Sequence, residues 1–202
     1  MANPFFAPST LPYQLPPFAE IEERHYAEAI EAGMAEQLRE IQAITVKRDM
    51  PTFENTMVPL ESSGQLLTRV LRVFYNQSSA DSSDATSALE EEFAPRLSAH
   101  EDAIMLDAAL YWRIAQLHEQ RHELSLTEEQ RYLIERHYTR MTLAGAGLDD
   151  EQKAQLSALN GRLSTLTTQF EKNLLADTNA LAVHVATREE LDGLSEGEIS
   201  AA

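Results

Sequence analysis

The 202-residue sequence contains no cysteine. This absence excludes disulfides, thiolate metal sites and cysteine nucleophiles. The N-terminus lacks a basic segment followed by an apolar run, and no stretch approaches the roughly 18 apolar residues that a membrane-spanning helix requires. We therefore expect a protein of a reducing, aqueous compartment, most simply the cytoplasm.

Basic side chains are also scarce, with 16 Lys and Arg against 33 Asp and Glu and a formal net charge of −17. Because each phosphate contact requires a cation, this balance argues against nucleic acid and anionic membrane surfaces as partners. Glycine and proline are few (7 and 8), and 43% of the residues are hydrophobic. This composition favours a mainly helical, all-α protein with a real core.

The stretch Asp149–Thr178 is the longest predicted helix. Its large apolar residues recur at steps of three and four: Leu156, Leu159, Leu163, Leu166, Phe170 and Leu174. This spacing places them on one stripe of a helix. Asp149 followed by Gln152 can cap the first turn, and the helix is about 40 Å long at roughly 1.5 Å per residue. A helix of this length cannot bury its stripe alone, so the rest of the chain must pack against it.

Before this helix, the chain divides into an arm and an antiparallel array of helices over residues 20–178. Residues 1–19 contain five prolines among large apolar residues, which predicts an extended arm lying across a helical surface. Further helices are expected over Glu20–Val46, from Thr52 or Thr56 onward, around Leu89–Ile104 with a bend at Pro95, from Asp107, and from Thr127 to Gly145. Ser78–Ser87 is expected to form a loop.

After Thr178 the pattern changes. Leu181, Val183 and Val185 alternate with smaller or polar residues, which predicts a short strand over 181–186. Ser195 with Glu198 forms a capping box for a helix beginning near Gly197. A strand without a partner and a helix of one turn cannot support themselves. We therefore interpret residues 179–202 as a strand and the start of a truncated helix, in a chain cut from something longer.

One motif points to metal chemistry. The sequence HEQRH fits the H-E-x-x-H pattern, in which His118 and His122 would bind zinc and Glu119 would activate water. A zinc site needs a third protein ligand, and position 128 is Glu128 instead of a histidine, while Leu143–Leu148 contains no glutamate. Histidine near the end of a helix also interacts well with the helix dipole. We assign no catalytic, cofactor-binding or metal-binding residue, and a small zinc hydrolase using these residues stays as an alternative.

Several stretches, in order along the chain, resemble the bacterial dipeptidyl carboxypeptidases, oligopeptidase A and thimet oligopeptidase. The matching segments are Asn3–Phe6, Ser9–Tyr13, Pro17–Phe18, Pro51–Thr56, Pro59–Glu61, Ser63–Val70, Leu143–Ala146, Lys153, Leu156, Leu159, Asn160, Phe170, Asn173–Leu175 and Asp177–Thr178. Together they cover essentially the whole chain. The sequence is thereby identified as similar to the N-terminal region of this family.

The resemblance implies a zinc peptidase much longer than 202 residues, built mostly of helices and divided by a deep channel that admits short peptides. Its zinc ligands and their H-E-x-x-H motif would lie in the C-terminal half, beyond Ala202. Residues 1–202 would then be an N-terminal helical domain that forms part of the channel wall and holds no zinc itself. Its partners would be the missing C-terminal catalytic portion and an oligopeptide whose C-terminal dipeptide is released.

Two other hypotheses stay open at this point. The chain could be a free-standing helical interaction module that is complete as it is. Alternatively, an apolar face left exposed on the fragment could drive self-association.

Overall fold

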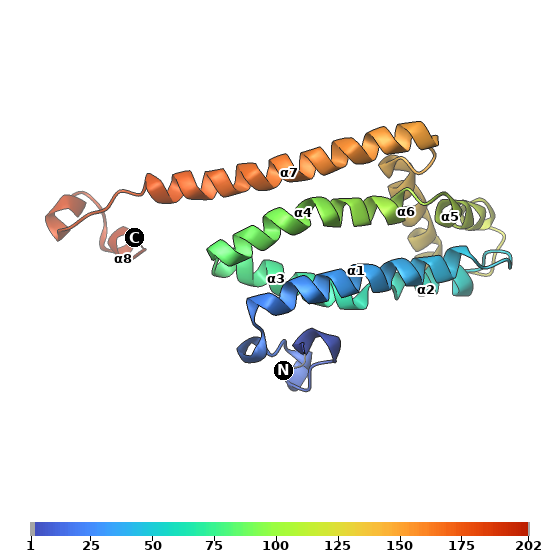
Figure 1. The fold of residues 1–202 in the computed structure, drawn as a ribbon, viewed down its shortest axis with the longest axis horizontal. Helices are drawn as coiled ribbons and strands as arrows, with labels where there is room; N and C mark the ends of the chain where they lie inside the picture. Colours follow the sequence, from blue (N-terminus) through green and yellow to red (C-terminus); the bar gives the residue numbers. More distant parts are fainter. Residues whose placement is uncertain (1–2, 202) are drawn as a thin grey trace. The chain divides into compact units, whose positions relative to one another are not determined.

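A computed structural model describes residues 3–201. Most of these residues are helical, and no strand is present within the described range, which confirms the mainly helical fold. The helices (Figure 1) are α1 (Glu23–Thr45), α2 (Val58–Glu61), α3 (Gln65–Ala80), α4 (Asp84–Met105), α5 (Ala108–Gln120), α6 (Glu128–Ala144), α7 (Asp150–Ala180) and α8 (Glu196–Ala201). The chain forms two compact units, divided between Thr168 and Gln169.

The first core lies between α1, α3 and α4. Tyr26 on α1 contacts the edge of the Phe74 ring on α3, with ring centroids 5.1 Å apart. Gly33 on α1 lies so close to Leu67 on α3 that a Cβ atom at Gly33 would be 2.9 Å from the Leu67 backbone. These contacts run in opposite directions along the two sequences, so α1 and α3 are antiparallel. The buried residues of this core are Phe5, Tyr26, Ala29, Ile30, Leu66, Leu67, Val70, Val73, Phe74 and Phe93.

A second core joins the end of α1 to α5 and α6. Its buried residues are Ile41, Ile44, Met57, Ile104, Leu110, Ile114, Leu117, Ile134, Met141 and Ala146. Beside it, Arg113 of α5 is 1% exposed. Its guanidinium donates to Asn55 Oδ1 at 2.7 Å and, at 3.2 Å each, to Thr56 Oγ1 and the carbonyls of Lys47 and Asp49. Arg113 therefore holds the connection between α1 and α2 in place. Burial lowers the pKa of this guanidinium, and the nearby Asp49 carboxylate opposes that shift.

The first described residues of the N-terminal arm pack on α1 and α3. Asn3 Nδ2 donates to the His25 carbonyl at 2.9 Å, and Phe5 is buried against Tyr26. Arg69 on α3 donates to the Phe5 carbonyl. The arm is not uniformly extended, because its prolines start short 3₁₀ turns (Pro4–Phe6, Pro12–Gln14, with a third at Phe18–Glu20).

Capping residues, glycines and prolines predicted several helix ends correctly and others inaccurately. Gly145 adopts a left-handed conformation (φ 100°) and ends α6, as predicted. Pro95, at which a bend was predicted, lies inside α4, which continues to Met105. The predicted loop Ser78–Ser87 is shorter, since α3 continues to Ala80 and α4 begins at Asp84 after the Ser83 cap. The helix predicted from Glu20 begins at Glu23, where Glu22 and His25 form its capping box.

The second unit, residues 169–202, contains the end of α7, a 3₁₀ turn at Arg188–Leu191 and α8. The strand predicted over 181–186 is wrong: these residues form neither strand nor helix. A strand forms only when a neighbour accepts and donates its backbone hydrogen bonds, and no described segment pairs with this one. Ser195 and Glu198 do form the predicted capping interaction at the start of α8.

Candidate functional site

Helix α7 carries the predicted apolar stripe, but the chain does not bury it. None of its residues is buried, and the side chains at Leu163 and Phe170 are 64% and 66% exposed. The other exposed members of the stripe are Leu159, Leu166 and Leu174. Helix α7 (Figure 1) therefore lacks the packing partner that its apolar stripe requires.

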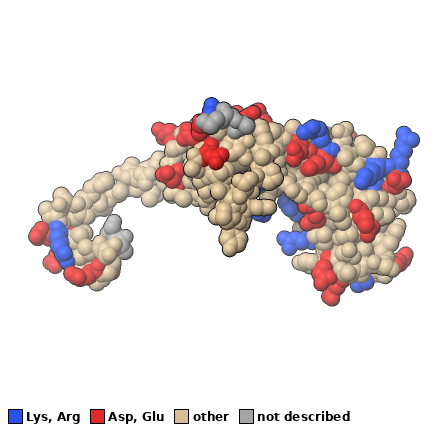
Figure 2. Space-filling view, turned by 90° about the horizontal axis from the view of Figure 1, so that it is seen from below, with Lys and Arg blue, Asp and Glu red and all other residues tan. Residues whose placement is uncertain are grey.

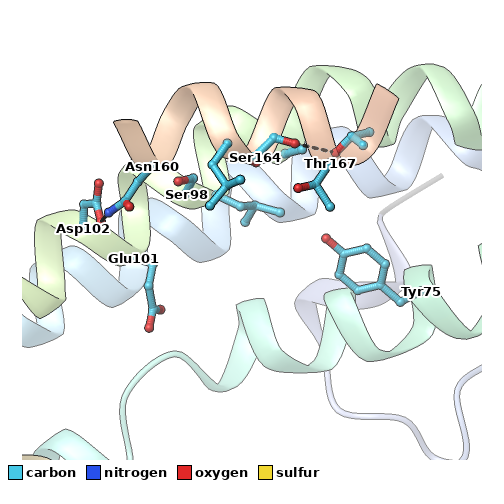
Figure 3. A pocket seen from close by; sticks show the side chains of 11 residues that line it. Tyr75, Ser98, Glu101, Asp102, Asn160, Ser164 and Thr167 are labelled. Atoms are coloured by element: carbon cyan, nitrogen blue, oxygen red, sulfur yellow. Dashed lines mark hydrogen bonds between the residues drawn. The ribbon is translucent and has the colours of Figure 1, made fainter. Parts of the chain in front are cut away.

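A hollow of about 510 Å³ lies where the first half of α7 faces α4. Leu97 lines it from α4 and Leu163 from α7. Figure 3 shows Ser98 of α4, Thr167 of α7 and Tyr75 of α3 around the same hollow. The lining mixes apolar surface with hydroxyl groups. Such a surface suits a polypeptide segment, which presents both apolar side chains and hydrogen-bond donors.

A second hollow of about 360 Å³ continues along the same two helices. Small residues line it on both sides: Ala99 and Ala103 on α4, with Ala154, Ser157 and Gly161 on α7. Small side chains cannot fill the space between two helices. The two helices are therefore held at this point by polar contacts instead of an apolar core.

Asp102 of α4 lines both hollows and makes a polar contact with α7. Its Oδ1 accepts from Asn160 Nδ2 at 2.8 Å, and the two residues lie side by side in Figure 3. Its Oδ2 is buried and has no hydrogen-bond partner. Lys153 makes the second contact, donating from Nζ to the Leu106 carbonyl at 2.9 Å. The sequence carried no signal for the pairing of Asp102 with Asn160, because the two residues are 58 positions apart.

The HEQRH residues do not form the arrangement that the motif requires. The prediction that this motif lies on one helix is wrong, because α5 ends at Gln120 and the chain turns there. The N–H groups of Glu123 and Leu124 both donate to the Gln120 carbonyl. His122 therefore lies in the turn, so the two histidines do not share a helix face.

His118 has a different role, which its position at the end of α5 allows. Its ring stacks on Tyr138 of α6, with centroids 4.0 Å apart and planes 11° from parallel. Tyr138 in turn stacks on Tyr111. Burial lowers the pKa of His118, and the adjacent Arg121 lowers it further. Over residues 3–201, no group of three or more His, Asp or Glu side chains is placed to hold a metal ion.

A third cavity, of about 170 Å³, lies among α1, α2, α4 and α6. Two polar pairs border it: a hydrogen bond between His137 and Glu61, and an ion pair between Arg140 and Glu101 at 2.7 Å. At least one partner in each pair is about half exposed or more, so solvent screens the attraction and the stabilisation is small. The sequence carried no signal for the pairing of His137 with Glu61, because the two residues are 76 positions apart.

Figure 2 shows both acidic and basic side chains on one face of the molecule. Acidic and basic side chains are interspersed there, and the basic ones form small separate groups. Among the described helices, none is long and apolar enough to span a membrane.

No family model matches the sequence. The chain is 40% identical over 200 residues to the dipeptidyl carboxypeptidase of Escherichia coli strain K12 and 39% identical to that of Salmonella typhimurium strain LT2. Each match covers 99% of this chain and 29% of the relative. Oligopeptidase A of Escherichia coli is 25% identical over 202 residues, again covering 29% of its own length. The chain thus spans less than a third of the relatives it matches, and its similarity to them fits the N-terminal region of the dipeptidyl carboxypeptidase and oligopeptidase A family.

Proposed function

We propose that this chain is the N-terminal, channel-wall part of a cytoplasmic zinc metallopeptidase that releases dipeptides from the C-termini of oligopeptides. The observation that carries the proposal is the 40% identity to a dipeptidyl carboxypeptidase over nearly the whole chain. The match spans 29% of that relative, and the proposal assigns the catalytic residues to the part of the polypeptide outside the match. In this proposal residues 1–202 confine the substrate and do no chemistry.

The residues of this chain support the proposal that they confine the substrate and do not catalyse the reaction. The one H-E-x-x-H sequence does not fit a zinc site, because His118 stacks on Tyr138 and His122 lies beyond the end of α5. The exposed stripe of α7 also requires a partner, as expected for one part of a larger fold. Zinc is accordingly proposed for the full-length peptidase and not for this chain.

A chimera tests the proposed activity. This chain replaces the matched N-terminal stretch of the Escherichia coli dipeptidyl carboxypeptidase, and dipeptide release from an oligopeptide is followed by mass spectrometry. We expect the chimera to release C-terminal dipeptides, and the 202-residue chain alone to release none. The Escherichia coli enzyme without its matched stretch is the control. A folded chimera no more active than that control contradicts the proposal.

Metal content tests the alternative of a small zinc hydrolase. The 202-residue chain is equilibrated with zinc, freed of excess metal and measured by elemental mass spectrometry, beside its His118→Ala variant. We expect neither protein to retain stoichiometric zinc. One zinc per chain, lost on His118→Ala, would instead establish His118, Glu119 and His122 as a metal site.

A further inference from the structure

We propose that the third cavity, of about 170 Å³, binds a small aliphatic primary amine. The ammonium group lies at the charged rim of the cavity, and the hydrocarbon tail lies on its apolar floor. This inference goes beyond the proposed function and does not depend on it, because every residue that carries it belongs to this chain.

The floor of the cavity is apolar. Its residues are Leu60 of α2, Ile104 and Met105 of α4, Leu110 of α5 and Met141 of α6. Three of them have little contact with solvent, since Ile104 is 8% exposed, Leu110 1% and Met141 2%. A water molecule in a cavity needs about two to four polar partners, which these side chains do not supply. A hydrocarbon group is therefore the better occupant of the floor.

The volume of the cavity limits the size of the ligand. At about 30 Å³ for each water-sized group, the cavity holds about six non-hydrogen atoms. This number suits a tail of about five carbons with one polar head group. A helix with its side chains is about 10 Å across and does not fit. The cavity therefore accommodates a small molecule and excludes a folded segment of polypeptide.

The two polar pairs described above form the rim of the cavity. Helix α6 contributes His137, which is bonded to Glu61 of α2, and Arg140, which is bonded to Glu101 of α4. His137 and Arg140 are three residues apart, so they lie on neighbouring positions of one helix surface. Glu61, Glu101 and Arg140 are exposed. The rim is therefore the side of the cavity that is open to solvent.

The charge of the rim selects a cation. With histidine counted as neutral, the rim has two carboxylates and one guanidinium. Over residues 3–201, the hydrogen bonds of Glu61 and Glu101 use only Oε1, so Oε2 of each carboxylate is available to another donor. A primary ammonium supplies several N–H donors on a compact head group. The net charge of −17 on the whole chain also attracts cations and repels carboxylates.

Methionine NMR tests the binding of an amine. Met105 and Met141 line the cavity, whereas Met50 is 63% exposed and is the internal control. The 202-residue chain, with carbon-13 in its methionine methyl groups, is titrated at neutral pH with 3-methylbutylamine, 3-methylbutanol and 3-methylbutanoate, which share a branched tail and differ in charge. The substitutions Met105→Leu and Met141→Leu assign the two cavity resonances.

We expect the amine to shift the resonances of Met105 and Met141 saturably and to leave that of Met50 in place. Half-saturation should occur at about 1–10 mM, as expected for a ligand with so few atoms. The alcohol should bind about fivefold more weakly, because it lacks the charge. The carboxylate should give no saturable shift.

A double variant tests the role of the two carboxylates. Glu61→Gln with Glu101→Gln retains polar side chains of the same size at the rim but removes both charges. We expect binding of the amine to weaken about fivefold and binding of the alcohol to stay the same. The matched control is Glu123→Gln with Glu135→Gln, at exposed positions that do not line the cavity. An equal loss of amine binding in the control would overturn the assignment of the ammonium to the rim.

Several other outcomes of the titrations overturn the proposal. The absence of a saturable shift at Met105 and Met141 does so, and so does equal binding of the three compounds. Tighter binding of the carboxylate would assign the rim to an anion at Arg140. Shifts of Met50 that parallel those of the cavity methionines would show that the amine binds without a defined site.

A lysine side chain from the rest of a longer polypeptide presents the same ammonium and tail, and the chimera described above distinguishes this source. We expect the amine to shift Met105 and Met141 in the chimera as it does in the isolated chain. Resonances that are already displaced in the chimera and do not respond to the amine would assign the cavity to such a side chain and overturn the proposal. Because none of these titrations measures dipeptide release, their failure leaves the proposed function standing.

Discussion

Helices α3 and α7 carry apolar side chains at the same helical spacing, but only α3 is packed. Five residues of α3 are buried against α1 and its neighbours: Leu66, Leu67, Val70, Val73 and Phe74. In α7 no residue is buried. The comparison shows that an apolar stripe establishes the need for a partner, whereas the presence of that partner depends on other parts of the polypeptide.

The largest expected contrast comes from a matched pair of phenylalanines. Phe74 is 1% exposed and Phe170 is 66% exposed. Phe74→Ala removes a ring from the core and should lower the free energy of unfolding by about 3–5 kcal/mol, because it leaves a cavity. Phe170→Ala should change it by less than about 0.5 kcal/mol. Urea denaturation of the 202-residue chain measures both, and equal losses would mean that the stripe of α7 is covered in solution.

A smaller effect is expected from removing the buried guanidinium of α5. Arg113→Met fills similar space but leaves acceptors at Asn55, Lys47 and Asp49 without their donor, so we expect a loss of about 2–4 kcal/mol. Arg162→Met, on the exposed side of α7, is the control and should change stability by less than about 0.5 kcal/mol. Denaturation curves that coincide for the two variants would show that Arg113 does not hold the α1–α2 connection.

Two glycine variants test the comparison further, because they should change the stability of the chain in opposite directions. Gly33→Ala places a Cβ 2.9 Å from the Leu67 backbone and should destabilise the chain by about 1–3 kcal/mol, despite the higher helix propensity of alanine. Gly161→Ala meets no atom within 4 Å and should stabilise the chain by about 0.5–1 kcal/mol. Thermal melting distinguishes them. Destabilisation by Gly161→Ala would indicate that α4 and α7 pack more closely than the hollow beside Gly161 implies.

The smallest expected effect is on the pH dependence of stability. Burial lowers the pKa of His100 from its usual 6.5, although Glu101 raises it. This histidine therefore takes up its proton at a higher pH in the unfolded chain than in the folded one, so stability is lost as the pH falls below about 6.5. His100→Gln should flatten the dependence of the melting temperature on pH between 7.5 and 5.5. His184→Gln, at an exposed position in the second unit, should leave it unchanged; an equally steep dependence in both variants would exclude His100 as the source.

Features that depend on neighbouring residues were predictable from the sequence. The capping box of Thr127 and Gln130 and the glycine stop at Gly145 form as expected, because their hydrogen bonds close within a few residues. The strand over 181–186 could not be judged in this way, since a strand needs a partner from elsewhere in the chain. The placement of all of HEQRH on one helix was wrong for a related reason: two residues of the motif lie beyond the end of α5, and nothing in the five letters shows where that helix stops.

The candidate site was even less predictable. Asp102 and Asn160 lie on different helices, and neither residue stands out in the sequence. The apolar stripe of α7 was predicted correctly, but its exposure was not. No feature of the neighbouring sequence distinguishes an apolar stripe that this chain buries from one that it leaves exposed.

By itself, the sequence determined the helical class, most of the helices and the resemblance to the dipeptidyl carboxypeptidases, because each depends on composition, helical periodicity or short ordered motifs. The tertiary structure alone decided that α3 is buried while α7 is exposed, and that a groove with an unsatisfied carboxylate lies beside α7. The physical reason is the range of the interactions: helical hydrogen bonds close within four residues, whereas burial requires surfaces supplied by distant segments.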